Sequence, residues 1–177
     1  MSYNERKNYL TGNILSDEWF TPENVVDFIY KNFSVNNKKI ICPFDSEKSE
    51  FTKKFPNSIN SIKDFMEKDY DYDICITNPP FSLKEKVVEK ILKDNKEAIL
   101  VLPQTFLYST TFYDFVKKYK FFYDVYIPRT RIYFYDEKGN QNRPNFHSVI
   151  VHIKNNVLEY GKNKYIDLDK YKFLEKE

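Results

Sequence analysis

Glycine is scarce in this chain of 177 residues, which contains only Gly12, Gly139 and Gly161. No glycine lies between positions 13 and 138. Glycine-rich loops that hold phosphates need a backbone that adopts positive φ and approaches the ligand closely. We therefore expect no glycine-rich phosphate or dinucleotide loop in that interval.

Cysteine and histidine are almost as rare. Cys42 and Cys75 both lie inside apolar segments, which indicates buried free thiols rather than a disulfide or a metal site. His147 and His152 are five residues apart in a strand-like run. This spacing argues against a zinc site.

Long apolar runs are also missing. No stretch approaches 18 uninterrupted apolar residues, and residues 1–6 do not open a signal peptide. A charged share of 31% beside a hydrophobic share of 41% is typical of a soluble globular protein. We expect one domain with a substantial core, located in the cytoplasm and not bound to a membrane.

The most informative segment is 71–81. Its apolar run 74–76 has the length and branching of a buried parallel strand. Pro79 and Pro80 end the strand, because proline fixes φ near about −65° and has no N–H. The same prolines hold the backbone of Asn78 extended. A side-chain carbonyl from Asn78 and an aromatic face from Phe81 would then lie at the carboxyl end of the strand, where open α/β sheets bind ligands.

These groups suit a planar heterocycle with an exocyclic amino group. The ring would stack on Phe81, which is worth roughly 1–3 kcal/mol, while the amine donates to Asn78 and the Pro79 carbonyl. The sequence Asn78-Pro79-Pro80-Phe81 resembles motif IV of the S-adenosylmethionine-dependent amino methyltransferases, best known for adenine N6 in DNA. The resemblance implies that these four residues are catalytic. The alternative is a strand that ends in a Pro-Pro turn, with Phe81 in the core.

Thr21 and Pro22 precede a segment with helical spacing of apolar residues. One interpretation is structural: Thr21 is the N-cap and Pro22 the first helical residue. A Thr-Pro pair that enters a helix before the first strand also resembles motif X of the same family. That resemblance implies that Thr21 and Pro22 contact the methionine part of S-adenosylmethionine.

The segment 39–43 predicts the first strand, and Phe44-Asp45 forms its exit turn. Asp45 resembles the acidic residue of the family's first motif, and the segment 42–51 resembles a divergent phage-type subgroup. The family's Gly-x-Gly turn is replaced here by Ser46, Lys48 and Ser49. Capping by Asp45 or Ser46 of a helix that runs to about residue 55 is the alternative.

Asp64-Phe65 follows a weak second strand at 57–62 and resembles motif III, whose aspartate accepts from the adenine amine of the cofactor. The alternative is an aspartate that starts a helix, followed by a core phenylalanine. The resemblance as a whole implies S-adenosylmethionine as the cofactor and assigns its binding to Thr21, Pro22, Phe44, Asp45, Asp64, Phe65 and Asn78.

Three of the four arginines lie close together, at positions 129, 131 and 143. The segments 129–134 and 145–151 predict two antiparallel strands joined by a loop, and they resemble the last strand pair of phage-type adenine methyltransferases. Phosphate contacts by Arg129, Arg131 and Arg143 would follow. Ordinary surface arginines are the alternative, since a net charge of +2 does not by itself indicate nucleic acid.

Strands and helices alternate along the rest of the chain, with helices at 83–93 and 111–119 and strands at 97–103 and 121–127. This alternation predicts an α/β fold: a Rossmann-like, doubly wound, mostly parallel sheet with an antiparallel terminal strand. We expect an irregular segment 1–16, a single methyltransferase-like domain 17–154, and a tail or helix at 155–177.

Three functions are consistent with these patterns. The first is methyl transfer to an exocyclic amine, N6 of adenine in DNA, with RNA, cytosine N4 and protein amides chemically accessible to the same acceptors. No segment is long enough for a separate recognition domain, so the 129–145 hairpin or a partner chain would supply target recognition. The second is a catalytically degenerate methyltransferase fold that serves as a binding or regulatory protein. The third is an unrelated α/β nucleotide-binding protein.

Overall fold

The computed structural model describes residues 19–60, 64–136, 138–142, 144–154 and 163–173. Its helices are α2 (Glu23–Asn32), α3 (Glu50–Lys54), α4 (Lys84–Lys93), α5 (Gln104–Leu107) and α6 (Thr110–Tyr119). Its strands are β1 (Ile40–Cys42), β2 (Ile59–Asn60), β3 (Ile74–Thr77), β4 (Glu97–Pro103), β5 (Phe122–Pro128), β6 (Phe134–Tyr135), β7 (Gln141–Asn142), β8 (Ser148–Lys154), β9 (Asn163–Asp167) and β10 (Lys172–Phe173).

Eight of these strands form one sheet in the order β10-β9-β5-β8-β4-β3-β1-β2. Strands β1, β2, β3 and β4 run parallel to one another, whereas β8 runs antiparallel to both β4 and β5. The predicted fold class is therefore confirmed. The antiparallel strand lies inside the sheet, between β4 and β5.

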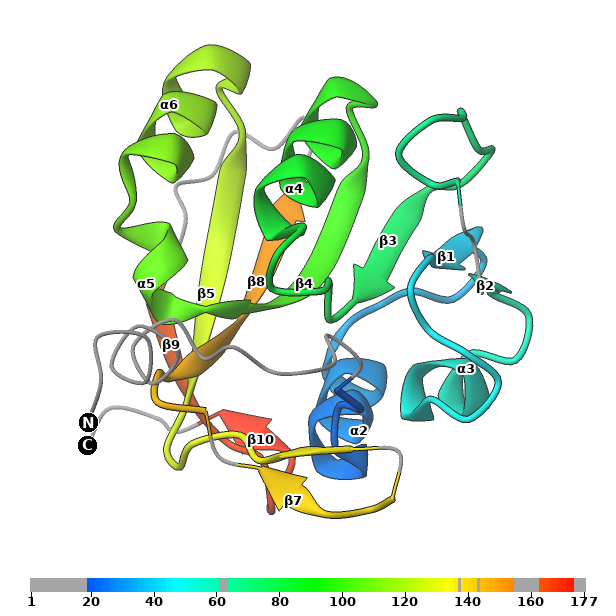
Figure 1. Ribbon diagram of the computed structural model, residues 1–177, viewed down its shortest axis with the longest axis vertical. Coiled ribbons are helices and arrows are strands. Elements are labelled where there is room, and N and C mark those ends of the chain that lie inside the picture. The colour runs from blue at the N-terminus through cyan, green and yellow to red at the C-terminus, as the bar shows by residue number, and fades with distance from the viewer. Residues whose placement is uncertain (1–18, 61–63, 137, 143, 155–162, 174–177) are drawn as a thin grey trace, which may run out of the picture.

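Helices cover both faces of the sheet (Figure 1). On one face α2 and α3 pack against alternate strand residues such as Ile74, Ile76 and Ile150. On the other face α4, α5 and α6 pack against the intervening residues, among them Cys75 and Leu100. All four residues of β3 are buried, as expected of a central strand covered on both sides.

The amphipathic pattern of α4 is confirmed, because Val87, Val88, Ile91 and Leu92 are its buried residues. Within the described residues, no helix combines the length and the apolarity needed to cross a membrane.

Two predicted helix caps are wrong. The N-cap position of α2 is Pro22, and no side chain caps this helix. Thr21 therefore lies one residue before the cap. Helix α3 is capped by Ser49, whose hydroxyl accepts from the Phe51 N–H, and not by Asp45 or Ser46. In both cases the helix begins one to four residues later than the pattern predicts, an error that is common at helix ends.

The C-terminal half also differs from the prediction. Residues 129–133 lie outside any strand, and only Phe134 of the first predicted hairpin strand belongs to one, β6, which pairs with β7 in a separate two-stranded sheet. The second predicted strand is confirmed for residues 148–151, which belong to β8, but they pair with β4 and β5 and not with the first hairpin strand. The expected tail or helix at 155–177 is corrected for residues 163–173, which form β9 and β10 at the edge of the main sheet. The predicted irregular segment 1–16 lies outside the described residues.

Candidate functional site

The carboxyl ends of β1 and β3 meet where the strand order reverses. From β1 the chain passes to β2 on one side and later returns to place β3 on the other side. In open α/β sheets, ligands bind outside the strand ends at such a switch point. Asp45 lies three residues after β1, and Asn78 directly follows β3. The structure therefore brings these two predicted residues to the same edge.

The Asp45 carboxylate links the two strand ends. It accepts hydrogen bonds from Thr77 Oγ1 at 2.8 Å and from Ser49 Oγ at 2.6 Å. Burial raises the pKa of Asp45 to about 6, and the two hydroxyl hydrogen bonds act in the opposite direction. Asp45 thus connects the turn after β1 to the last residue of β3.

The turn between β1 and α3 is made without glycine. The Asp45 N–H donates to the Cys42 carbonyl at 3.2 Å, and the Ser49 N–H donates to the Ser46 carbonyl at 2.9 Å. No residue from 43 to 49 has a positive φ. The backbone of this turn therefore does not use the conformation that favours glycine.

The raised pKa of Asp45 predicts a pH-dependent effect of Asp45→Asn on stability. The folded protein binds the carboxyl proton of Asp45 more tightly than the unfolded chain does. Wild type therefore loses stability as the pH rises from about 4 to about 6. The amide does not titrate. Relative to wild type, we expect the free energy of unfolding of Asp45→Asn to increase by about 2 kcal/mol between pH 4.5 and 7.5 in urea titrations.

Asp64→Asn is the matched control. Hydrogen bonds from Lys68 and Tyr70 lower the pKa of Asp64, so its contribution to stability is complete above its unfolded pKa and is lost only as the pH falls further. This variant should show no rise relative to wild type over the same pH interval. A pH-independent difference for Asp45→Asn would mean that Asp45 ionises with an ordinary pKa.

Asn78 presents a buried acceptor at the end of β3. Its Oδ1 atom is shielded from solvent and has no hydrogen-bond partner within the described residues. Buried polar atoms in folded proteins are nearly always hydrogen-bonded, so an exception needs an explanation. A ligand amine that donates to Oδ1 would supply one.

The ring of Phe81 is half-buried and packs against the core on the α2 side. It makes edge-to-face contacts with Phe134, at a centroid distance of 6.0 Å, and with Phe146, at 5.1 Å. Phe81 is therefore partly a core residue, as the structural alternative predicted. The sequence analysis did not identify Phe134 and Phe146 as neighbours of the site, and only their position in aromatic, strand-like segments pointed to them.

Asp64 and Phe65 lie in the segment before β3. The Asp64 carboxylate pairs with Lys68 and accepts from the Tyr70 hydroxyl. Phe65 is 1% exposed and packs in the α4-side core, edge-to-face on Phe44 at a centroid distance of 5.8 Å. Phe65 is therefore a core phenylalanine, as the alternative interpretation predicted, and Phe44 is its aromatic neighbour.

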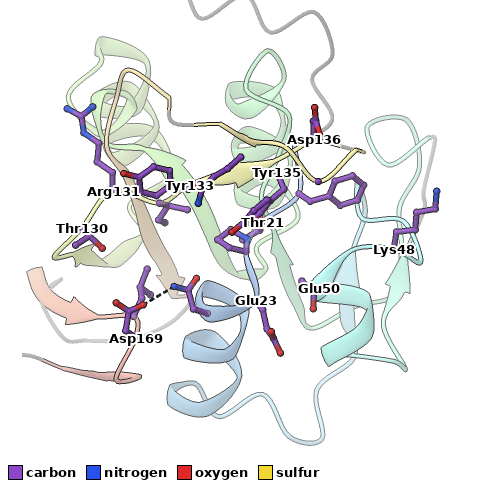
Figure 2. A pocket seen from close by; sticks show the side chains of 17 residues that line it. Thr21, Glu23, Lys48, Glu50, Thr130, Arg131, Tyr133, Tyr135, Asp136 and Asp169 are labelled. Carbon is purple, nitrogen blue, oxygen red and sulfur yellow. Dashed lines mark hydrogen bonds between the residues drawn. The ribbon is translucent and has the colours of Figure 1, made fainter.

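A cavity of about 810 Å³ lies beside the start of α2. Residues 20–24, 130–133 and Asp169 line it together with the β6–β7 hairpin and the residues just before and within α3 (Figure 2). The lining brings together Thr21 and Pro22, which were predicted to contact the cofactor, and Arg131, which was predicted to contact phosphate. It contains four carboxylates (Glu23, Glu50, Asp136, Asp169) and two cationic side chains (Lys48, Arg131).

Strand β6 contributes to both the cavity and the Asn78 region. Phe134 contacts Phe81, whereas Tyr133 and Tyr135 line the cavity. Asn78 and Phe81 are not among the residues that line the cavity. Strand β6 therefore connects the cavity to Phe81.

The predicted phosphate-binding arginines are only partly described. Arg129 has 65% of its side chain exposed and lies 3.9 Å from an Asp167 carboxylate oxygen. Arg131 lines the cavity (Figure 2). Arg143 lies outside the described residues.

Both cysteines are buried free thiols, as predicted, and burial raises the pKa of each. His152 Nε2 lies 2.7 Å from a Glu97 carboxylate oxygen at the opposite, amino end of β4. In the part of the chain that the structure describes, no group of three or more histidine, cysteine or acidic residues could hold a metal ion.

Solved structures provide the clearest comparison, since no protein-family model and no curated sequence matches the chain. A dimethyladenosine transferase from Plasmodium falciparum superposes with a TM-score of 0.50 at 15% identity, over 78% of this chain and 63% of the other. A protein from Pyrococcus horikoshii, assigned as an RNA methyltransferase, gives 0.50 at 12% identity, over 77% and 84%. A protein from Listeria monocytogenes, assigned as a class I S-adenosylmethionine-dependent methyltransferase, gives 0.51 at 10% identity, over 87% and 68%.

At such low identity these likenesses concern the fold, and this chain spans less than two thirds of the Plasmodium enzyme. In this chain the fold consists of a mostly parallel sheet covered by helices on both faces, with β8 antiparallel between β4 and β5. The chain has the Rossmann-like fold of the class I methyltransferases.

Proposed function

We propose that this protein transfers a methyl group from S-adenosylmethionine to an exocyclic amine, with N6 of adenine in DNA as the target. The observation that carries the proposal is the buried Oδ1 of Asn78 at the switch point of this fold, which has no hydrogen-bond partner among the residues that the structure describes. A nucleobase amine has the donor that this acceptor lacks. The two prolines that follow Asn78 and the ring of Phe81 supply the remaining parts of the predicted motif.

The cavity suits the amino-acid end of the cofactor. S-adenosylmethionine carries an ammonium and a sulfonium cation, and four carboxylates outnumber two cationic side chains around the cavity. Its carboxylate would meet the positive end of the α2 dipole beside Thr21 and Pro22. Phe44 and Asp45 at the switch point and Asp64 before β3 are the further residues proposed to hold it, and the buried ring of Phe65 would act only by supporting Phe44.

When bound, the cofactor supplies an electrophilic methyl group. The protein's own contribution is to orient the amine: Asn78 Oδ1 and the Pro79 carbonyl would each accept a hydrogen bond from one of its two N–H groups, which takes the nitrogen lone pair out of conjugation with the ring and turns it towards the electrophile. Geometry and electrostatics of this kind need no general base. Phe81 contributes apolar contact with the base. Phe134 of β6 packs against the ring of Phe81.

The polymer that carries the adenine is part of the proposal. Exposed Arg129 and the arginines at 131 and 143 are proposed phosphate contacts, with Asp167 as a competitor for Arg129. The structural neighbours include enzymes named for dimethyladenosine and for RNA. RNA is therefore the alternative substrate, and a partner chain would supply sequence recognition.

One observation favours the second hypothesis, a degenerate methyltransferase fold with a binding or regulatory role. Asp45, at the switch point, is already hydrogen-bonded to Thr77 and Ser49, and the turn beside it carries Ser46, Glu47 and Lys48 instead of small residues. These side chains occupy the position where a cofactor approaches the backbone closely in the family that the sequence resembles.

Calorimetric titration with S-adenosylmethionine and with its demethylated product distinguishes the two hypotheses. We expect binding weaker than about 1 µM, that is, less favourable than about −8 kcal/mol, because the side chains of the 46–49 turn restrict close approach. Thr21→Val removes a hydroxyl from the cavity and should weaken binding further, whereas Lys117→Ala on the exposed face of α6 should not. Absence of binding would favour the degenerate fold. A sub-micromolar dissociation constant would contradict the idea that the side chains of the 46–49 turn restrict approach of the cofactor.

A further inference from the structure

A second buried polar atom without a partner lies at the same end of the sheet. Ser148, the first residue of β8, is 2% exposed, and its Oγ has no hydrogen-bond partner in the described ranges. A hydroxyl can both donate and accept, and leaving it buried and unpaired is costly. Its position therefore suggests a ligand group.

The strand register places Ser148 and Asn78 on the two sides of β4. Ser148 lies opposite Pro103, the last residue of β4, and Thr77 lies opposite Leu100 of the same strand. Strands β3 and β8 are thus the two neighbours of β4 (Figure 1). Both atoms, which have no partner within the described residues, lie at the edge of the sheet where β3 and β4 end and β8 begins.

Alternation along β8 puts the Ser148 side chain on the α2 face, and the segment that follows β3 reaches the same face through Phe81. Ile76 and Ile150 belong to the α2-side core, and Asn78 and Ser148 each lie two residues from one of them. An aromatic contact joins the segments that contain these two residues. Phe81, three residues after Asn78, packs on Phe146, two residues before Ser148. Phe146 lies in an irregular segment just before β8.

We propose that Ser148 is a substrate-binding residue whose hydroxyl donates to a ring nitrogen beside the target amine. The assignment rests on the proposed function and specifies its substrate class. Adenine has ring nitrogens N1 and N7 on the two sides of its amino group, whereas a protein carboxamide has none. An acceptor from Asn78 and a donor from Ser148 would together select a heterocyclic amine.

The test combines Ser148→Ala with substrates that lack one ring nitrogen. Oligonucleotides that contain adenine, 1-deazaadenine or 7-deazaadenine at the target are compared by kcat/KM in wild type and variant. On adenine, Ser148→Ala should lose about tenfold in kcat/KM, the effect of one hydrogen bond. With one of the two deaza analogues, wild type and variant should be equally active, because the bond is already missing.

Ser148→Thr keeps the hydroxyl and should restore activity on adenine, and Ser58→Ala, which removes a buried hydroxyl before β2, should have no effect. Melting temperatures confirm that each variant is folded. An equal loss on all three substrates, or no loss on adenine, would overturn the assignment while wild type remains active. If wild type itself transfers no methyl group to adenine, the proposed function fails, and the assignment fails with it.

Discussion

Replacing Asn78 with alanine should reduce methyl transfer by at least about 100-fold, the size expected when one preorganised hydrogen-bonding group is lost. The lost interaction counts most when the amine lone pair is directed at the methyl group, so kcat should fall more than the affinity for the substrate. Because Oδ1 of Asn78 has no partner within the described residues, its removal leaves no protein donor there unsatisfied. The free energy of unfolding should change by less than about 1 kcal/mol.

The necessary measurements are single-turnover methyl transfer, cofactor affinity and melting temperature for the same preparation. Asn57→Ala, an exposed asparagine before β2, is the matched control and should retain full activity. If Asn78→Ala unfolds the protein, the motif is a structural turn. If it leaves transfer intact, the amine is held elsewhere.

Phe81→Ala should reduce both stability and substrate binding. The ring contacts Phe134 and Phe146 edge-to-face and packs against the α2-side core, so truncation should lower the free energy of unfolding by about 2–3 kcal/mol. Loss of contact with the base should weaken substrate binding by roughly 1–3 kcal/mol. Urea unfolding and equilibrium binding of the oligonucleotide measure the two effects separately.

Phe81→Tyr keeps the ring and should preserve most of the binding. Phe134→Leu is the second comparison, since it removes a ring that contacts Phe81 but is not proposed to touch the base. Loss of substrate binding in Phe134→Leu equal to that in Phe81→Ala would show that the base depends on the packing of the cluster and not on Phe81 itself.

The central part of the fold could be predicted because the information there is local. The run 74–76 is continuous and apolar, and two prolines end it, so the position of Asn78 followed from adjacent residues. The helix α4 likewise followed from the spacing of its buried residues. The same local signals predicted the parallel strands and therefore the fold class.

Contacts between distant segments could not be predicted. The hydrogen bond from Thr77 to Asp45 joins residues 32 positions apart, and neither residue carries a local signal for the other. The unpaired hydroxyl of Ser148 depends in the same way on the register of β8 against β4. Strand β9 was expected as part of a tail or helix, because its composition is mixed and its strand structure depends on pairing with β5.

Methyl transfer from radiolabelled S-adenosylmethionine to adenine-containing DNA, followed by digestion to nucleosides and chromatography, tests the central claim most directly. Our account predicts label in N6-methyladenine with wild type and at least about 100-fold less with Asn78→Ala. Parallel reactions with RNA identify the polymer. Absence of label in any nucleic acid with wild type, or equal label with Asn78→Ala, would contradict the account.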